Sequence, residues 1–248
     1  MGLFGLFASK EEREKNALRK LGRKITEKYG PPENRQKAIE QLGDLRTDAA
    51  LRTLLLRFTV RVDPGITDEQ EKDTVRRLVV GAGDLAVAPI ESFLREREEG
   101  VAWGLRALAE IAPDRVLPLV VAELARLGRE YTRDPEKKLT LLAWLREHHA
   151  GETAPEVEEA LLPLLEDFSD DVRIGATRVL AARPPSERAR EGLIALLLRD
   201  RDNPRVRGEV LAALAGLGVD VKGHRPSVEA LLVDPWYLDK EGHVKKRG

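Results

Sequence analysis

Few side chains in this sequence have the types and spacing that catalysis or metal binding requires. The chain contains no cysteine, which excludes a thiol nucleophile and thiolate metal ligands. His148 and His149 are adjacent, so on a helix their side chains would point about 100° apart and could not chelate one ion together. Glu147 and Glu152 lie close by, but a zinc site needs three or four convergent ligands. The pair therefore predicts a solvated helix end, and we expect no metal site.

Sequence motifs of known enzyme classes are missing as well. The chain holds no nucleophile elbow of the form Gly-x-Ser-x-Gly, no phosphate-binding loop and no dinucleotide fingerprint. An active site would have to be assembled from distant parts of the chain, and the sequence leaves that alternative open. We predict no catalytic residues and no cofactor, and we expect that the protein is not an enzyme.

Charge is segregated in the C-terminal half of the chain. Residues 152–171 hold eight acidic residues and no Lys or Arg, whereas residues 173–207 hold nine arginines against four acidic residues. Such a bipolar surface can orient a charged partner or another copy of the chain, and an ordinary solvated surface is the alternative. The predicted partner-binding arginines are Arg188, Arg190, Arg199 and Arg201. We expect Arg190, Arg199 and Arg201 to lie on or beside one exposed basic patch.

The composition favours helices that pack through thin apolar layers. The chain has 248 residues, of which 42% are hydrophobic, only 4% aromatic and 34% charged. Leu, Ala, Glu and Arg dominate, as is typical of a helical globular protein. The net charge is −1, so bulk charge does not recruit nucleic acid or an anionic membrane.

A repeat of 34 residues organises the chain. The pattern Val172-Arg173 with Leu180 recurs 34 positions later as Val206-Arg207 with Leu214. Self-similarity at this period is typical of helical repeat arrays. We therefore predict an all-α fold, an α-solenoid of about six antiparallel helix pairs, each with a first (A) and a second (B) helix. The predicted pairs span about residues 33–59, 68–98, 101–129, 135–167, 171–199 and 204–233.

The two ends of the chain depart from the repeat, so we divide the chain into residues 1–32, 33–233 and 234–248. The first segment holds an apolar stretch and a helix over about 9–29 that would cap the array. Its side chains Phe4 and Phe7 either fold back onto that helix or form an exposed docking peptide or weak membrane anchor. The last segment predicts a small β-hairpin with a Gly-containing turn. Its aromatic residues Trp236 and Tyr237 either cover the last repeat or act as a recognition element.

These motifs resemble the HEAT-repeat family, and in particular its short bacterial type. The first-helix pattern is matched by Asp171-Val172-Arg173 with Leu180 and by Val206-Arg207 with Leu214, and the junction between helices by residues 109–119. The resemblance covers about residues 33–233. It implies that Arg173 and Arg207 form a ladder with neighbouring Asp side chains and loop carbonyls. The resemblance also implies DNA processing as an alternative function for this chain, because some bacterial HEAT-like proteins are DNA glycosylases.

We expect a non-catalytic scaffold or adaptor that binds a protein or peptide partner on its helical-repeat surface. Side chains of the B helices, the segment 188–207 and the two termini would supply the contacts. The alternative is a nucleic-acid-binding or DNA-processing protein that uses the arginine-rich segment 173–207, although the B helices at 85–98 and 155–167 are acidic or mixed, which argues against a DNA track. We expect the protein in the cytoplasm, because no apolar run approaches the roughly 18 residues of a membrane span.

Overall fold

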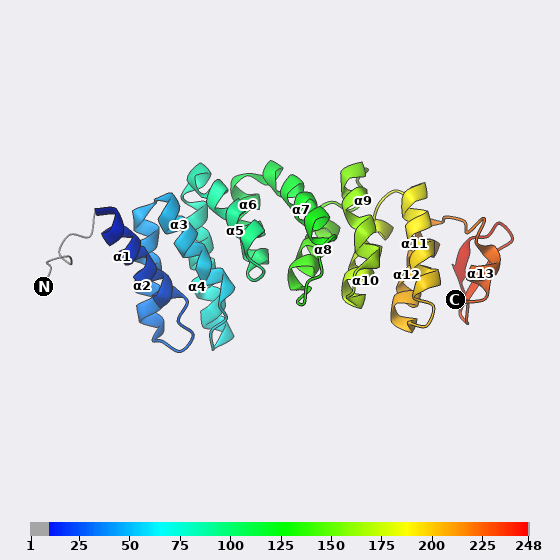
Figure 1. Ribbon diagram of the computed structural model, residues 1–248, viewed down its shortest axis with the longest axis horizontal. Coiled ribbons are helices and arrows are strands. Elements are labelled where there is room, and N and C mark those ends of the chain that lie inside the picture. Colours follow the sequence, from blue (N-terminus) through cyan, green and yellow to red (C-terminus); the bar gives the residue numbers. More distant parts are fainter. Residues whose placement is uncertain (1–9, 248) are drawn as a thin grey trace, which may run out of the picture. The chain divides into compact units, whose positions relative to one another are not determined.

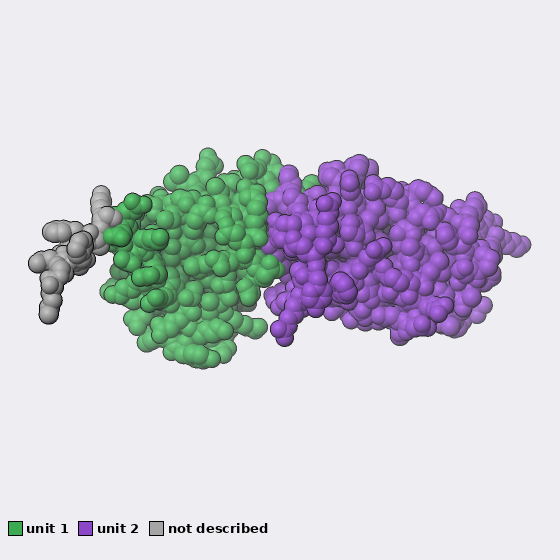
Figure 2. All heavy atoms as spheres, in the orientation of Figure 1, with its two compact units in different colours: residues 1–117 green, residues 118–248 purple. Residues whose placement is uncertain are grey.

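The computed structural model describes residues 10–247. Over these residues the chain forms thirteen α-helices, three 3-10 helices and one two-stranded antiparallel sheet (Figure 1). The chain divides into two compact units, Met1–Leu117 (unit 1) and Pro118–Gly248 (unit 2) (Figure 2). Apart from the small sheet, the regular secondary structure of the described residues is helical, which confirms the predicted all-α class.

Unit 1 is an N-terminal helix followed by helix pairs. Its elements are α1 (Lys10–Ile25), α2 (Pro32–Leu45), α3 (Asp48–Leu55), η1 (Leu56–Thr59), α4 (Gly65–Val80), η2 (Gly83–Ala86), α5 (Val87–Glu96), α6 (Val101–Ile111) and the start of α7 (Pro113–Leu127). Helix α1 packs against both α2 and α3. It therefore covers one side of the first pair, as a capping helix should.

Unit 2 continues the pairs and ends in the hairpin. Its elements after α7 are α8 (Glu136–His148), α9 (Pro155–Leu161), η3 (Leu162–Glu166), α10 (Asp170–Ala181), α11 (Glu187–Arg199), α12 (Pro204–Leu217), α13 (Arg225–Glu229), β1 (Trp236–Leu238) and β2 (Val244–Lys246). The two strands pair antiparallel with Trp236 opposite Lys246. Strand β2 packs on α12, where Val244 is fully buried. The six predicted pairs, the capping helix and the hairpin are thus all present.

The local sequence explains where several of these helices begin. Thr47, Ser186 and Asn203 accept hydrogen bonds through their side chains from backbone N–H groups at the starts of α3, α11 and α12. These contacts satisfy donors that have no partner within the helix. Leu180 on α10 and Leu214 on α12, which occupy equivalent repeat positions, are 2% and 0% exposed. The structure confirms the repeat register that the sequence predicted.

A ladder of basic residues ties neighbouring repeats together in unit 2. Arg173, near the start of α10, donates to Asp200 at 2.7 Å and to the carbonyl of Asp167 at 2.6 Å. One repeat earlier, Lys138 donates to Asp167 at 2.6 Å and to a loop carbonyl at 3.1 Å. Arg207 on α12 donates to a loop carbonyl at 2.8 Å. Arg173 thus makes both kinds of contact expected of the ladder, whereas Arg207 makes only the contact with a loop carbonyl.

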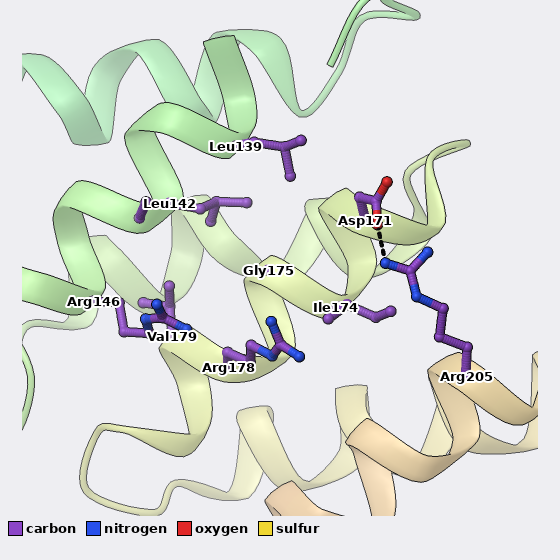
Figure 3. Close-up of a pocket in the computed structure, with 10 residues that line it drawn as sticks. Leu139, Leu142, Arg146, Asp171, Ile174, Gly175, Arg178, Val179 and Arg205 are labelled. Carbon is purple, nitrogen blue, oxygen red and sulfur yellow. Dashed lines mark hydrogen bonds and ion pairs between the residues drawn. The ribbon is translucent and has the colours of Figure 1, made fainter. Parts of the chain in front are cut away.

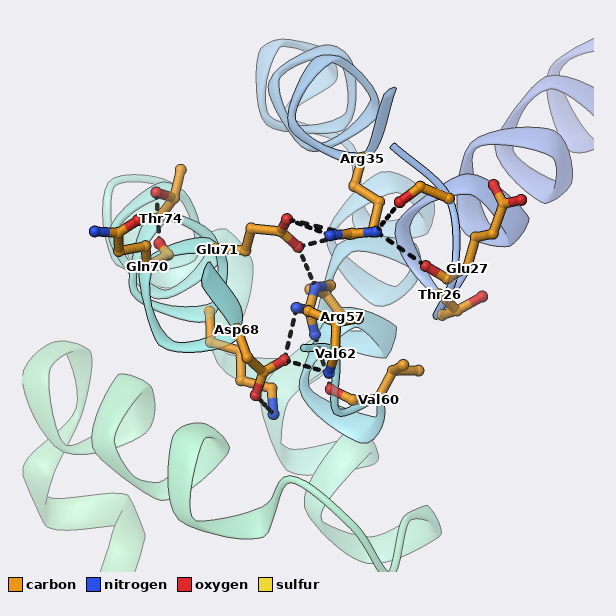
Figure 4. A network of polar contacts seen from close by, with 12 residues as sticks. Thr26, Glu27, Arg35, Arg57, Val60, Val62, Asp68, Gln70, Glu71 and Thr74 are labelled. Carbon is orange, nitrogen blue, oxygen red and sulfur yellow. Dashed lines mark hydrogen bonds and ion pairs between the residues drawn. The ribbon is translucent and has the colours of Figure 1, made fainter. Parts of the chain in front are cut away.

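Unit 1 contains a buried ionic network between α2, η1 and α4 (Figure 4). Arg35 on α2 donates to both carboxylate oxygens of Glu71, at 3.0 and 3.1 Å. Arg57, which is fully buried, donates to Glu71 at 2.9 Å and to Asp68 at 2.7 Å. Burial raises the pKa of Asp68, but hydrogen bonds from Lys72 and Arg57 outweigh it and hold that pKa below its ordinary value. Helix α4 therefore docks through paired charges as well as through apolar contacts.

Candidate partner-binding surface

A groove of about 250 Å³ lies between α8 and α10, the A helices of two successive pairs in unit 2 (Figure 3). Its floor is apolar, and its rim carries three arginines and one aspartate. The lining residues on α8 are Leu139, Leu142, Ala143 and Arg146, those on α10 are Asp171, Ile174, Gly175, Arg178 and Val179, and Arg205 comes from α12. The groove therefore combines an apolar surface with a cationic rim.

Helical spacing places these side chains along one line on each helix. On α8 the lining residues stand at positions i, i+3, i+4 and i+7, which share one face of an α-helix. The α10 positions follow the same pattern. Gly175 lets the two helices approach closely, because a Cβ added there would stand 2.9 Å from Leu142 Cδ1. This close approach pairs the middle of α8 with the middle of α10. The two stripes run in the same direction, since Leu139 and Asp171 lie toward one end and Arg146 and Arg178 toward the other (Figure 3).

The three arginines of the rim differ in their partners. Arg178 donates to Glu209 at 2.9 Å, and Arg205 pairs with Asp171. The side chains of Arg178 and Arg205 nevertheless remain 48% and 62% exposed. Arg146 is exposed and has no hydrogen bond or ion pair to any of the described residues. The groove thus holds an unpaired cation beside an apolar floor.

The hydrogen bond between Arg178 and Glu209 changes the titration of both groups. It lowers the pKa of Glu209 and raises the pKa of Arg178. Glu209 is therefore charged at neutral pH and offsets Arg178, which leaves Arg146 as the main source of uncompensated charge among the described groove residues.

The prediction that Arg190 lies on an exposed basic patch is wrong, because this residue is only 9% exposed. Its guanidinium donates to the carbonyls of Asp220 and Lys222 at 2.7 Å each. Arg199 remains accessible, although it donates to Asp200. Arg201 is 67% exposed in its side chain and lies 3.6 Å from Asp202.

Arg188 is the one arginine of the segment 173–207 that makes neither a hydrogen bond nor an ion pair with the part of the chain that the structure describes. Each of the other eight has an acidic partner, a backbone carbonyl or both. Those eight are Arg173, Arg178, Arg183, Arg190, Arg199, Arg201, Arg205 and Arg207. The surplus of arginines in the sequence is therefore largely used within the fold, which weakens the case for a phosphate-binding track.

The predicted aromatic candidates at the termini divide between described and undescribed residues. Tyr237 is 40% exposed, and the guanidinium of Arg247 lies 5.7 Å from its ring centroid. Trp236 is half-buried beneath the ammonium of Lys246 at 5.6 Å. Residues 1–8, with Phe4 and Phe7, lie outside the described residues, so both alternatives for that segment stay predictions.

Imidazole and carboxylate groups gather at two places in unit 2. At the end of α8, the rings of His148 and His149 lie 4.9 and 5.0 Å from the indole of Trp144. At the turn of the hairpin, the carboxylate and imidazole atoms of Asp239, Glu241 and His243 lie within 4.8 Å of one another. Asp239 accepts a hydrogen bond from the backbone N–H of His243, and the two side chains are also hydrogen-bonded to each other, which holds the turn. The sequence did not single out this group.

Unit 1 has grooves of its own. One of about 660 Å³ lies between the A helices α2 and α4 and is lined mainly by polar side chains, including Gln36 and Gln70. Another of about 230 Å³ lies between α3 and α5 and includes Leu56 and Phe93. The latter is formed by B helices, the face that the sequence favoured for binding. That preference stays a prediction.

Part of unit 2 matches a known family of helical repeats. Residues 158–240 match the family model described as HEAT repeats. The match lies within unit 2 and confirms the HEAT-like resemblance. No curated protein matches the sequence significantly. Human deoxyhypusine hydroxylase in complex with glycerol is a similar solved structure, at 18% sequence identity over 91% of this chain and 92% of that chain, with a TM-score of 0.36.

Between residues 10 and 247, no helix is long and apolar enough to cross a membrane.

Proposed function

We propose that this chain is a non-catalytic scaffold that binds a protein or peptide partner in the groove between α8 and α10. The observation that carries the proposal is the unpaired Arg146 beside an apolar floor that includes Leu139 and Leu142. An apolar groove anchors a ligand by burying its side chains, and a nearby cation selects a partner that carries a carboxylate. HEAT repeats commonly mediate protein interactions, which agrees with this use of unit 2.

The ion pairs between repeats support the same proposal. Arg173 pairs with Asp200 in the loop before α12, and Lys138 pairs with Asp167 in the loop before α10, and both pairs are largely buried. A groove formed by helices that are fixed in this way loses little conformational freedom when a partner binds. In this proposal residues 33–233 form the binding array in the cytoplasm. The remaining predicted residues contribute at its periphery, and these are Arg188, Arg199, Arg201, Trp236, Tyr237, Phe4 and Phe7.

Peptide selection tests the proposal. Peptides are selected against the full chain from a displayed library of random sequences, and fluorescence anisotropy then measures their affinities for groove variants. Ala143→Trp fills the groove from an exposed position, and Arg146→Glu reverses its unpaired charge. The matched controls are Ala195→Trp on the exposed face of α11 and Arg133→Glu, whose arginine is exposed and lacks a partner among residues 10–247.

The expected result is that each groove variant weakens binding by about tenfold or more, while the two controls bind like the parent. Equal affinity for all five proteins would refute the groove as the binding site. A fluorescent DNA duplex is measured alongside. If the duplex binds more tightly than any peptide and loses affinity steeply with salt, nucleic-acid binding replaces the proposal.

A further inference from the structure

We propose that the groove between α8 and α10 takes an amphipathic, acidic α-helix of its partner, which packs as a third helix along both stripes. This inference rests on the proposed protein-binding function and names the chemistry of the ligand. It follows from three properties of the groove, which are its length, its lack of free backbone groups and the position of its charges.

The length of the groove corresponds to two helical turns. The lining residues of α8 run from Leu139 to Arg146, and those of α10 from Asp171 to Val179. Seven residues of an α-helix rise about 10 Å. Two parallel stripes of this length can hold the i, i+3, i+4 and i+7 side chains of a ligand helix, which is the usual pattern of a helix bound in a groove. The α8 side chains divide between core and groove, because Leu141 and Leu145 are buried, Leu142 lines the groove at 2% exposure, and the half-buried Leu139 and the exposed Ala143 offer the accessible apolar surface.

The groove is poorly suited to an extended peptide. An extended ligand gains much of its affinity from main-chain hydrogen bonds to an open sheet edge. The walls of this groove are two helices, whose backbone groups are bonded within each helix. A ligand that enters it must satisfy its own backbone groups, since unpaired amides are costly to bury. An α-helix meets this requirement.

The uncompensated charge lies at one end of the stripes. Arg146 and Arg178 are near the C-terminal ends of α8 and α10, one from each wall, and only Arg178 has an acidic partner, Glu209. At the opposite end Arg205 is balanced by Asp171. A ligand helix with apolar side chains at i, i+3 and i+4 should therefore carry a carboxylate one turn further, opposite Arg146. Burial of its apolar face would strengthen this ion pair by excluding water.

Two displayed libraries test the inference on the full chain. One presents four randomised positions on the exposed face of a stable helix, and the other presents random linear sequences with a central proline that prevents helix formation. The expected result is enrichment from the helical library alone, with Asp or Glu at the position one turn from the apolar residues. Replacement of that acid by its amide should weaken binding about tenfold, and Arg146→Glu should do the same.

A charge exchange provides the decisive control. A peptide with Lys in place of the acid should bind Arg146→Glu better than it binds the parent, whereas Arg133→Glu should show no such preference. Binders only from the proline library, or helical binders without an acid, would overturn the helical inference. If the peptides bind Ala143→Trp as tightly as they bind the parent, the groove is not the binding site, and the proposed function is refuted together with the inference. Self-association in sedimentation that Ala143→Trp abolishes, without peptide binding, would identify a second copy as the occupant and overturn the inference.

Discussion

Replacement of Arg57 by alanine should destabilise unit 1 severely. The Arg57 side chain is fully buried. Its guanidinium donates to Glu71 at 2.9 Å, to Asp68 at 2.7 Å and to the carbonyl of Val60 at 2.8 Å. Removing one partner of a buried ion pair leaves an uncompensated charge and costs about 3–5 kcal/mol. Here Glu71 keeps Arg35 and Asp68 keeps Lys72, so we expect about 3 kcal/mol, near the lower limit of that range.

Urea unfolding followed by circular dichroism measures this loss. The total stability of a protein of this kind is about 5–15 kcal/mol, so a cost of about 3 kcal/mol should lower the unfolding midpoint clearly. The matched control is Arg61→Ala, which removes an exposed arginine without a partner in the described chain. Arg57→Lys should fall between the parent and the alanine variant, because one ammonium group cannot reach all three acceptors. Equal midpoints for Arg57→Ala and Arg61→Ala would refute the energetic role of the network.

Three further predictions concern unit 2 and the acid sensitivity of unit 1. Leu214→Ala should cost about 2–5 kcal/mol, and hydrogen exchange should show the damage mainly in adjacent repeats; protection lost evenly across the chain would contradict this. Arg190→Ala should cost about 1–3 kcal/mol, since it leaves the partly buried carbonyls of Asp220 and Lys222 without their donor, whereas urea midpoints should show no change for Arg188→Ala. Because the folded pKa of Asp68 is depressed, its stabilising effect is complete above the unfolded value of about 3.9 and is lost as the pH falls through the folded pKa. Asp68→Asn should therefore lower stability at neutral pH and flatten its dependence on pH below about 4; an unchanged pH profile would contradict the assignment.

The sequence predicted the parts of the fold that depend on local periodicity. The helix pairs follow from apolar residues at helical spacing, and equivalent positions such as Leu180 and Leu214 are buried as expected. Pro163 lacks the backbone N–H that a continuous helix needs at this position. In the structure α9 ends at Leu161, and a 3-10 helix contains Pro163. Such features can be predicted because each depends on a few neighbouring residues.

The A helix of the second pair departs from the apolar repeat pattern. Helix α4 buries Asp68, Glu71 and Lys72 in its first half, so its inward stripe is charged where a repeat pattern expects apolar residues. The partners that make this burial possible are distant in sequence. Arg35 lies 36 residues before Glu71, and only the folded chain brings them together. A rule that assigns charged residues to the surface fails at such positions.

The arginine-rich segment shows why a charge count is a poor guide to surface charge. The count set nine arginines against four acidic side chains, but it omitted backbone carbonyls. Arg190 is held by two of them, and Arg207 by another. In contrast, Arg146 lies outside the dense segment, seven residues after Leu139. A free cation is expected where an arginine continues an apolar stripe on a helix face and the neighbouring helix offers no acceptor, and this combination requires knowledge of which helices are neighbours.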